Sequence, residues 1–428
     1  PGAHSNFGLA IAATDFGIVG IDDANNIKPI SARPNVTSIA VAGNTVLAGL
    51  FNGGVADLTP ELTQPANRTA LTDKPSLAIA GSVEASRLPH ASATVEVSDG
   101  VVWALTEEGA YVRAVSSSKP AFEPAAASLT GGRMLTAGHI TGLAIDDRGM
   151  LWVGYFDRGI DVIDPESAER LAHLEDEQLR QVNCVTFDAA GSRVLAATSR
   201  GLAELGSRTG PATAKMTVLT REKDNIISNS IAHVAFGETA RGARSMVLAT
   251  AGGLTEVAEG RSRSLTAFHG LASNHLYAAA FGGSKLFVGS LAGLVELENL
   301  RVVRTYKTSN SRLSHDWVTA LAFIDGSLYV GTNGGGVDAL LQTGEWINFA
   351  DFTGKFEVNQ NAMCYDNERL YVGTTTEGIL VYNLRDRTWI RFTAGLSSRN
   401  VTALTTDNQF VYAGTLNGLT RIEKRAIK

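Results

Sequence analysis

The sequence predicts an all-β protein, a β-propeller built from four-stranded antiparallel blades. The first observation is an internal repeat: residues 395–418, GLSSRNVTALTTDNQFVYAGTLNG, have a close copy at 270–293, GLASNHLYAAAFGGSKLFVGSLAG. The second is the period, because similar units follow one another roughly 40 to 55 residues apart, as propeller blades do. The third is the alternation of apolar and polar residues within each unit, which is typical of strands separated by short turns.

Each unit is predicted to form three strands and often shows a fourth. An apolar run, a turn with Gly, Asp or Asn, a second run that ends in Gly-Thr or a small substitute, and a third run follow in order. Outer strands are visible at 388–393 (TWIRFT) and 345–350 (EWINFA). We expect the glycine of the second strand to permit a close approach between neighbouring sheets. The equivalent positions are Gly49, Leu105, Gly154, Ala197, Ala249, Gly289, Gly331, Gly373 and Gly414.

These anchors define nine complete units and one partial unit at 9–21, whose first strand would have to begin about where Pro1 begins and is therefore expected to be missing. The units start near residues 8, 36, 92, 140, 182, 231, 276, 318, 360 and 401. We predict one domain over 1–428 with nine or ten blades. Two smaller rings are the alternative, and the ring could also close by pairing the N-terminal piece with 419–428. Closure itself is expected, because an open stack leaves two bare sheet edges.

The composition agrees with a turn-rich β protein. Of the 428 residues 44% are hydrophobic and only 19% are charged, and 44 are glycines. Segment 165–180 is the best candidate for a short helix, and no apolar run has the length of about 20 residues that a membrane span needs. The net charge of −6 is spread along the chain, so we predict no nucleic-acid partner. Cys184 and Cys364 are expected to be small buried residues, too far apart to be bridged.

Catalytic and metal-binding signatures are absent from the sequence. It has no G-x-S-x-G elbow, no H-E-x-x-H, no phosphate-binding loop and no cysteine pair at zinc spacing. We therefore predict no catalytic residue, no cofactor and no metal site. Whether the chain is an enzyme stays open, with a binding role favoured.

Candidate ligand contacts come from loops rather than from repeat positions. Connections that enter first strands and turns between second and third strands should meet on one face of the ring, over the channel, where propellers bind ligands. Aromatic side chains could stack on a ligand and arginines could hold an anionic group. The predicted ligand-binding residues are His139, His275, Trp317, Asn400, Arg399, Tyr155, Phe156, Arg158, Arg200 and Glu377.

The repeat resembles a known family. The pattern GL-x-S-x-x-V-x-x-L, a turn, and then L-W/Y-V-G-T-x-x-G-L is similar to the two-component-regulator propeller repeat of bacterial sensor proteins, most clearly at 395–419, 318–337, 270–294 and 140–160. The resemblance implies a propeller and a periplasmic or extracellular sensing module. In that family such propellers usually precede a membrane span and a kinase, whereas this sequence ends directly after its last unit, so we expect a free-standing binding protein.

Three functions follow as hypotheses. The leading one is a non-catalytic module that recognises a small molecule, glycan or peptide over the central channel, with a membrane sensor or another protein as a possible further partner. The second is a protein-interaction scaffold that uses the irregular segment 58–89. The third is a lyase or hydrolase similar to streptogramin lyases, for which His139, His275 and Glu377 are the candidate residues.

Overall fold

The computed structural model describes residues 135–206, 216–238 and 242–427, together with the strands between residues 2 and 128 and the two residues 58–59. The chain divides into two compact units, Pro1–Ala127 and Ser128–Lys428. The single domain expected over 1–428 stays a prediction, since each unit is described by itself. No helix among the described residues is long and apolar enough to cross a bilayer.

Among its described residues the first unit contains three antiparallel sheets. Their orders are β1-β2-β3-β4, β5-β6-β7 and β11-β10-β9-β8. The strands are β1 (Gly2–Ser5), β2 (Leu9–Thr14), β3 (Gly17–Ile21), β4 (Ile27–Ser31), β5 (Val36–Ala42), β6 (Thr45–Leu50), β7 (Gly54–Asp57), β8 (Thr94–Ser98), β9 (Val101–Thr106), β10 (Gly109–Ala114) and β11 (Glu123–Pro124). The N-terminal repeat unit is thus a complete sheet, because β1 supplies the strand that the sequence analysis expected to be missing.

The second unit contains seven four-stranded sheets among its described residues, which we number as blades 1 to 7. Blade 1 is β13 (Ile140–Ile145), β14 (Leu151–Tyr155), β15 (Ile160–Asp164) and β16 (Glu169–Leu174); blade 2 is β17 (Val182–Asp188), β18 (Arg193–Thr198), β19 (Gly201–Gly206) and β20 (Thr217–Leu219); blade 3 is β21 (Ile231–Glu238), β22 (Arg244–Thr250), β23 (Gly253–Ala258) and β24 (Arg261–Leu265). Blade 4 is β25 (Leu276–Gly282), β26 (Lys285–Ser290), β27 (Gly293–Glu298) and β28 (Arg301–Tyr306); blade 5 is β29 (Val318–Ile324), β30 (Ser327–Thr332), β31 (Gly336–Leu340) and β32 (Trp346–Asn348); blade 6 is β33 (Val358–Tyr365), β34 (Arg369–Thr374), β35 (Ile379–Asn383) and β36 (Trp389–Phe392). Blade 7 is β12 (Ala126–Ser128), β37 (Val401–Thr406), β38 (Phe410–Thr415) and β39 (Gly418–Glu423). Short helices lie between blades: η1 (Glu177–Leu179), α2 (Arg221–Asp224), η2 (Ala267–His269) and α3 (Ala350–Thr353), with η3 (Lys424–Ala426) after β39.

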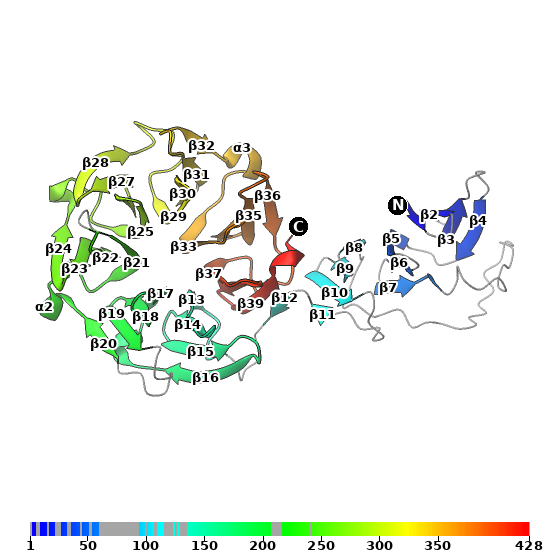
Figure 1. Cartoon of the computed structure of the whole chain (residues 1–428), viewed down its shortest axis with the longest axis horizontal. Coiled ribbons are helices and arrows are strands. Elements are labelled where there is room, and N and C mark those ends of the chain that lie inside the picture. The colour runs from blue at the N-terminus through cyan, green and yellow to red at the C-terminus, as the bar shows by residue number, and fades with distance from the viewer. Residues whose placement is uncertain are drawn as a thin grey trace. The chain divides into compact units, whose positions relative to one another are not determined.

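These seven sheets form a closed ring with the first strand of each blade nearest the centre (Figure 1). Blade 7 has the order β12-β39-β38-β37, so its outermost strand spans the boundary between the two units and the other three come from the end of the second. Its innermost strand, β37, packs against β13, the innermost strand of blade 1. The count of nine or ten blades in one ring is not confirmed, because this ring closes after seven sheets. The closing partner of β39 is β12, and it is not the N-terminal piece 9–21.

Neighbouring blades approach through the glycine of the second strand, as the sequence predicted. A Cβ added to Gly414 of β38 would lie 2.5 Å from Cγ2 of Ile140, the first residue of β13. Gly289 and Gly331 stand in the same way against Val318 and Val358, at 2.5 Å and 2.7 Å from a valine Cγ1. Since carbon atoms in contact are about 3.5 to 4 Å apart, no other residue fits without movement. The hydrophobic core therefore lies between the sheets, blade against blade.

One local prediction from the sequence is wrong. Segment 165–180 does not form one helix: Glu169–Leu174 is the outer strand β16, and only Glu177–Leu179 is helical. The first strand of blade 6 starts at Val358, near the expected residue 360, and carries a bulge. The two cysteines are free and lie on the first strands of blades 2 and 6, as predicted.

We expect Gly414→Ala to lower the unfolding free energy by about 1 to 3 kcal/mol, the usual cost of an extra methyl group in a packed interior. The denaturation midpoint in urea measures it. Gly206→Ala is the matched control, because nothing lies within 4 Å of a Cβ at that position. Equal midpoints for the two variants would contradict the role given to the glycine at the blade contact.

Candidate functional site

The two sets of loops predicted to share one face of the ring do so. The amide of Phe156, in the turn after β14, donates to the carbonyl of His139, which precedes β13 (3.2 Å). The same bond joins Leu291 to His275 and Asn333 to Trp317, at 3.2 Å and 2.9 Å. These three first strands thus extend by one residue before their starts and pair there with the turn. We call this side of the ring the mouth.

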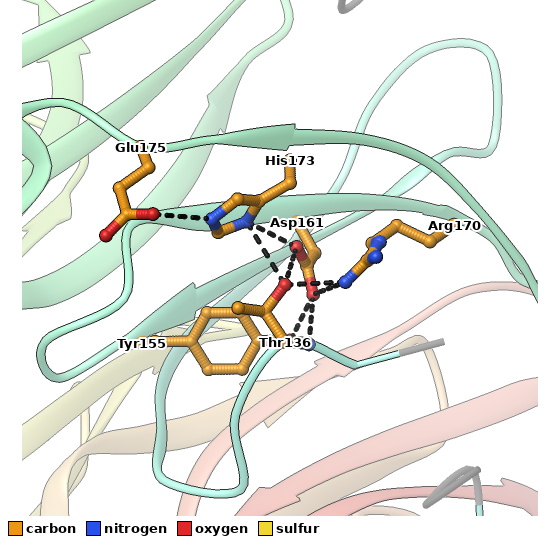
Figure 2. A network of polar contacts seen from close by, with 6 residues as sticks. All are labelled: Thr136, Tyr155, Asp161, Arg170, His173 and Glu175. Atoms are coloured by element: carbon orange, nitrogen blue, oxygen red, sulfur yellow. Dashed lines mark hydrogen bonds and ion pairs between the residues drawn. The ribbon is translucent and has the colours of Figure 1, made fainter. Parts of the chain in front are cut away.

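Side chains on third strands hold the loops at the mouth. In blade 1 the buried carboxylate of Asp161 accepts hydrogen bonds from the amide and the hydroxyl of Thr136, both at 2.8 Å (Figure 2). In blade 5 Asp338 does the same for Ser314, at 2.8 Å and 2.6 Å. Each anchored residue stands four positions before its first strand. The loop that carries His139, and the loop that carries Trp317, are therefore fixed by their own blade.

The network around Asp161 is structural in its geometry. Its carboxylate also accepts from the hydroxyl of Tyr155 (2.6 Å) and contacts Nδ1 of His173 (2.7 Å), and Arg170 lies 4.0 Å away (Figure 2). Thr136 Oγ1 lies 3.2 Å from the same Nδ1. Nε2 of His173 lies 3.4 Å from the Glu175 carboxylate (Figure 2). The hydroxyl of Thr136 donates its proton to Asp161 and its oxygen accepts from Nη1 of Arg170 at 2.7 Å. The imidazole therefore does not receive the hydroxyl proton, which an activated nucleophile requires.

A second set of bonds links the first strands around the ring. The second residue of most first strands is a bulged Thr or Asn, and its side chain donates to the carbonyl of the first residue in the next blade. We call these bonds the girdle. They run from Thr141 to Val182 (2.5 Å), Asn183 to Ile231 (2.8 Å), Thr319 to Val358 (2.8 Å), Asn359 to Val401 (2.7 Å) and Thr402 to Ile140 (2.5 Å).

The girdle is interrupted on both sides of blade 4, where the bulged residues are Ala232 and Tyr277. Alanine has no donor, and the phenol ring of Tyr277 instead stacks on His275 (centroids 5.1 Å apart) and tilts against Trp317 (5.5 Å). Burial raises the pKa of the Tyr277 phenol above its usual value. We call these two interruptions the open junctions. Between blades 4 and 5 these three aromatic side chains stand in place of the girdle bond. Between blades 3 and 4 the amide of Ala279 instead donates to Nδ1 of His233 at 3.3 Å.

Blade 6 extends across the ring toward the open junctions. Its first strand pairs Val358 with Thr374 and resumes at Met363 with Val372, so the bulge is longer than in the other blades. Asn361 in this bulge has a positive φ of 56°, which asparagine tolerates better than most residues. Its Nδ2 donates to the carbonyl of Ala232 in blade 3 at 2.8 Å. A side chain of one blade thus bonds the first strand of a non-neighbouring blade.

Two buried polar atoms of these residues have no hydrogen-bond partner among the described residues: Nε1 of Trp317 and Oδ1 of Asn361. A buried polar group without a partner costs about 1 to 3 kcal/mol. Such groups are uncommon in folded proteins.

The remaining predicted ligand contacts divide into exposed residues and residues that the fold uses. His139 stacks on Phe156 (5.2 Å between centroids), and Phe156 and Arg158 are exposed at the mouth. Tyr155 is completely buried, with its hydroxyl on Asp161. Its assignment as a ligand contact is corrected, because a side chain that closes the blade interior cannot also face a ligand.

Four other predicted residues already have partners within the ring. Arg200 pairs with Glu177 (2.8 Å) and Glu377 with Arg391 (2.9 Å). Asn400 Oδ1 accepts from Asn359 Nδ2 at 2.9 Å, which extends the girdle. The carbonyl of Arg399 accepts from the amide of Gly378 at 3.1 Å, and its side chain is exposed.

The residues named for an enzymatic role belong to different blades. His139, His275 and Glu377 lie in blades 1, 4 and 6, and no contact among the described residues joins them. The part of the chain that the structure describes contains no cluster of three or more His, Cys, Asp or Glu that could hold a metal ion. The segment 58–89, named for a scaffold role, lies outside the described residues from residue 60 onward.

Sequence reasoning missed Tyr277 and Asn361. Tyr277 stands where five other first strands have Thr or Asn, and this exception is visible once the units are aligned. Asn361 follows from a different signal, two additional residues between Val358 and the alanine that corresponds to Ala320. Both signals were hidden by the alternating pattern, which either residue fits.

Comparison with solved structures supports the propeller fold. The extracellular domain of a protein described as a hybrid two component system of B. thetaiotaomicron superposes with a TM-score of 0.57 at 16% identity, over 99% of this chain and 56% of that one. The chain thus spans little more than half of that domain. Virginiamycin B lyase from Staphylococcus aureus gives 0.51 at 11% identity over 69% of this chain and 97% of the lyase. The WD40 propeller domain of Doa1 gives 0.51 at 14%, over 68% and 95%. No family model matches the chain, and no curated protein does.

The likeness to the extracellular domain agrees with the family that the repeat resembles. At these identities the shared property is the propeller. The superpositions include almost the whole of the lyase and of the WD40 domain but only about two thirds of this chain.

We expect the stability of the ring to fall as the pH falls from 6.5 toward 4, in part through His233 of β21. Desolvation lowers the pKa of this imidazole to about 4 from its usual 6.5, and Nδ1 accepts from the amide of Ala279 (3.3 Å). Between these pH values the unfolded chain binds the proton and the folded one does not. The free energy of unfolding therefore falls by up to about 3 kcal/mol. Urea midpoints across this pH range should fall less steeply for His233→Gln than for the wild type. Parallel curves would contradict the assignment.

Proposed function

We propose that the chain is a non-catalytic ligand-binding or sensing propeller that recognises its ligand over the central channel, at the mouth. The observation that carries the proposal is the pair of open junctions. Five of the seven contacts between first strands are closed by a girdle bond, whereas the contact between blades 4 and 5 is made by the aromatic side chains of His275, Tyr277 and Trp317. Binding surfaces commonly combine such aromatic area with a few polar atoms that fix orientation.

The loop side chains in this part of the mouth are not needed to hold the ring together. His139 and Phe156 contact each other, and Arg200, Glu377 and Asn400 have partners in the ring. His275 is exposed, and its ring is held by stacking alone among the described contacts. We therefore centre the ligand site on His275, Tyr277 and Trp317, with His139 and Phe156 as a second contact on the opposite part of the mouth.

A location outside the cytoplasm belongs to the proposal. It rests on the resemblance of the repeat to sensor propellers and on the likeness to a domain described as extracellular. A membrane sensor that receives the binding signal is a possible partner. The ligand classes we consider are small molecules, glycans and peptides.

We expect Trp317→Ala and His275→Ala to abolish ligand binding while the ring stays folded, since both residues lie in loops before a first strand. The measurement is thermal melting of the three proteins against one library of small molecules, oligosaccharides and peptides. A ligand at 100 times its Kd adds about 2.7 kcal/mol to the unfolding free energy, which gives a shift of a few degrees. A ligand that shifts all three proteins alike would sink the proposed site.

A further inference from the structure

A cavity of about 420 Å³ lies between blades 3 and 4, on the side of the ring opposite the mouth. Its lining residues come from the end of β21, from the turns after β23, β25 and β27, and from the strands next to those turns. In antiparallel blades these turns are at the other end from the loops that carry His275 and Trp317. The volume is within the range of about 300 to 1,000 Å³ that small-molecule sites have. The cavity is therefore separate from the site proposed at the mouth.

The wall that blade 4 contributes is apolar. Phe281 of β25, Leu286 of β26 and Leu297 of β27 line it, and the two leucines are buried. Leu300, in the turn after β27, completes this wall. Its φ is 59°, which is unusual for a bulky residue. The equivalent turn of blade 3 has Gly260 there, at a φ of 71°, so blade 4 keeps a leucine at the cavity where the backbone favours glycine.

The wall that blade 3 contributes is charged. Glu256 of β23 is buried, and its carboxylate accepts from the hydroxyl of Ser245 at 2.9 Å and from Nη2 of Arg263 at 2.5 Å. At the position of Glu256, blades 5 and 6 have Ala339 and Val381. Between blades 3 and 4 an ion pair thus stands where other blades pack apolar side chains.

Three exposed charged residues of blade 3 line the same cavity: Glu238, Glu259 and Arg261. Both signs of charge therefore border one apolar wall. An acid with an apolar tail would bring its carboxylate close to Glu238 and Glu259, and an apolar amine would bring its cation close to Arg261. Like charges at such distances repel. A ligand that carries both an anionic and a cationic group on an apolar body meets an opposite charge for each.

We propose that this cavity binds a free α-amino acid with a bulky apolar side chain. The side chain packs on Phe281 and Leu300, where an aromatic ring can also stack. The α-carboxylate binds the fork of the Arg261 guanidinium, and the α-ammonium group binds the carboxylates of Glu238 and Glu259. This inference goes beyond the function proposed for the mouth and does not depend on it.

The first test compares L-phenylalanine with N-acetylphenylalanine, which lacks the cation, and with phenylalanine amide, which lacks the anion. Titration of the whole chain by ligand-detected NMR gives the Kd, which we expect at about 0.1 to 5 mM for L-phenylalanine. Each analogue should bind about fivefold more weakly, as the loss of one exposed ion pair predicts. Arg261→Gln should remove the preference for L-phenylalanine over the amide, and the double variant Glu238→Gln with Glu259→Gln should remove the preference over the N-acetyl form.

Leu300→Gly separates binding from stability. Glycine suits the positive φ, so we expect a urea midpoint close to that of the wild type, whereas loss of the apolar side chain should weaken L-phenylalanine about tenfold. Trp317→Ala, at the mouth, is the control and should bind L-phenylalanine like the wild type. Equal affinity for the three probes, unchanged selectivity in Arg261→Gln, or no binding of L-phenylalanine up to its solubility limit each overturns the proposal. Loss of binding in Trp317→Ala would place the amino acid at the mouth and overturn it as well.

Discussion

The close contact between the second strand of one blade and the first strand of the next decides how the ring is built. Gly289, Gly331 and Gly414 each leave room for the β-branched first residue of the following blade. Ala197 and Ala249 stand at the same position, and they share hydrophobic clusters with Ile231 and Leu276, the first residues of the following blades. The contact recurs between blades 7 and 1, so the same small volume that sets the spacing of the blades also closes the circle. A ring with this spacing admits a fixed number of sheets.

The girdle and the open junctions show how one position serves either the fold or the site. A bulged Thr or Asn donates a hydrogen bond to a carbonyl on the inner strand of the next blade and so ties the two blades together. At Ala232 and Tyr277 that bond is given up, and each such bond contributes about 1 kcal/mol. The cross-ring bond from Asn361 replaces part of this loss. The unpaired atoms that remain are the kind of local disagreement with folding rules that functional sites show.

Much of this architecture could be predicted from the sequence, because a period-two pattern fixes which residues face the interior. The starts of the first strands at Ile140, Val182, Ile231, Leu276, Val318 and Val401 follow from it directly. The size of the ring does not, since every unit looks alike and the strand that closes the circle is the short stretch Ala126–Ser128, which has no apolar alternation. Tyr155 was read as a ligand contact because a residue in the last position of a strand can face either the turn or the interior. Its hydroxyl donates to the buried carboxylate of Asp161. The sequence pattern does not reveal that this carboxylate is buried.

Blade 7 combines strands from the two ends of the ring, and this has a consequence for how the protein is made. The partner of β12 is β39, which is synthesised only after all the other blades. Contacts between residues so distant in sequence form slowly, because a long loop must close first. The strand β12 therefore has no partner until β39 is made, and the growing chain is most prone to pair with other chains in that interval. The closed ring is therefore stable, whereas the ring that is still incomplete is prone to aggregate.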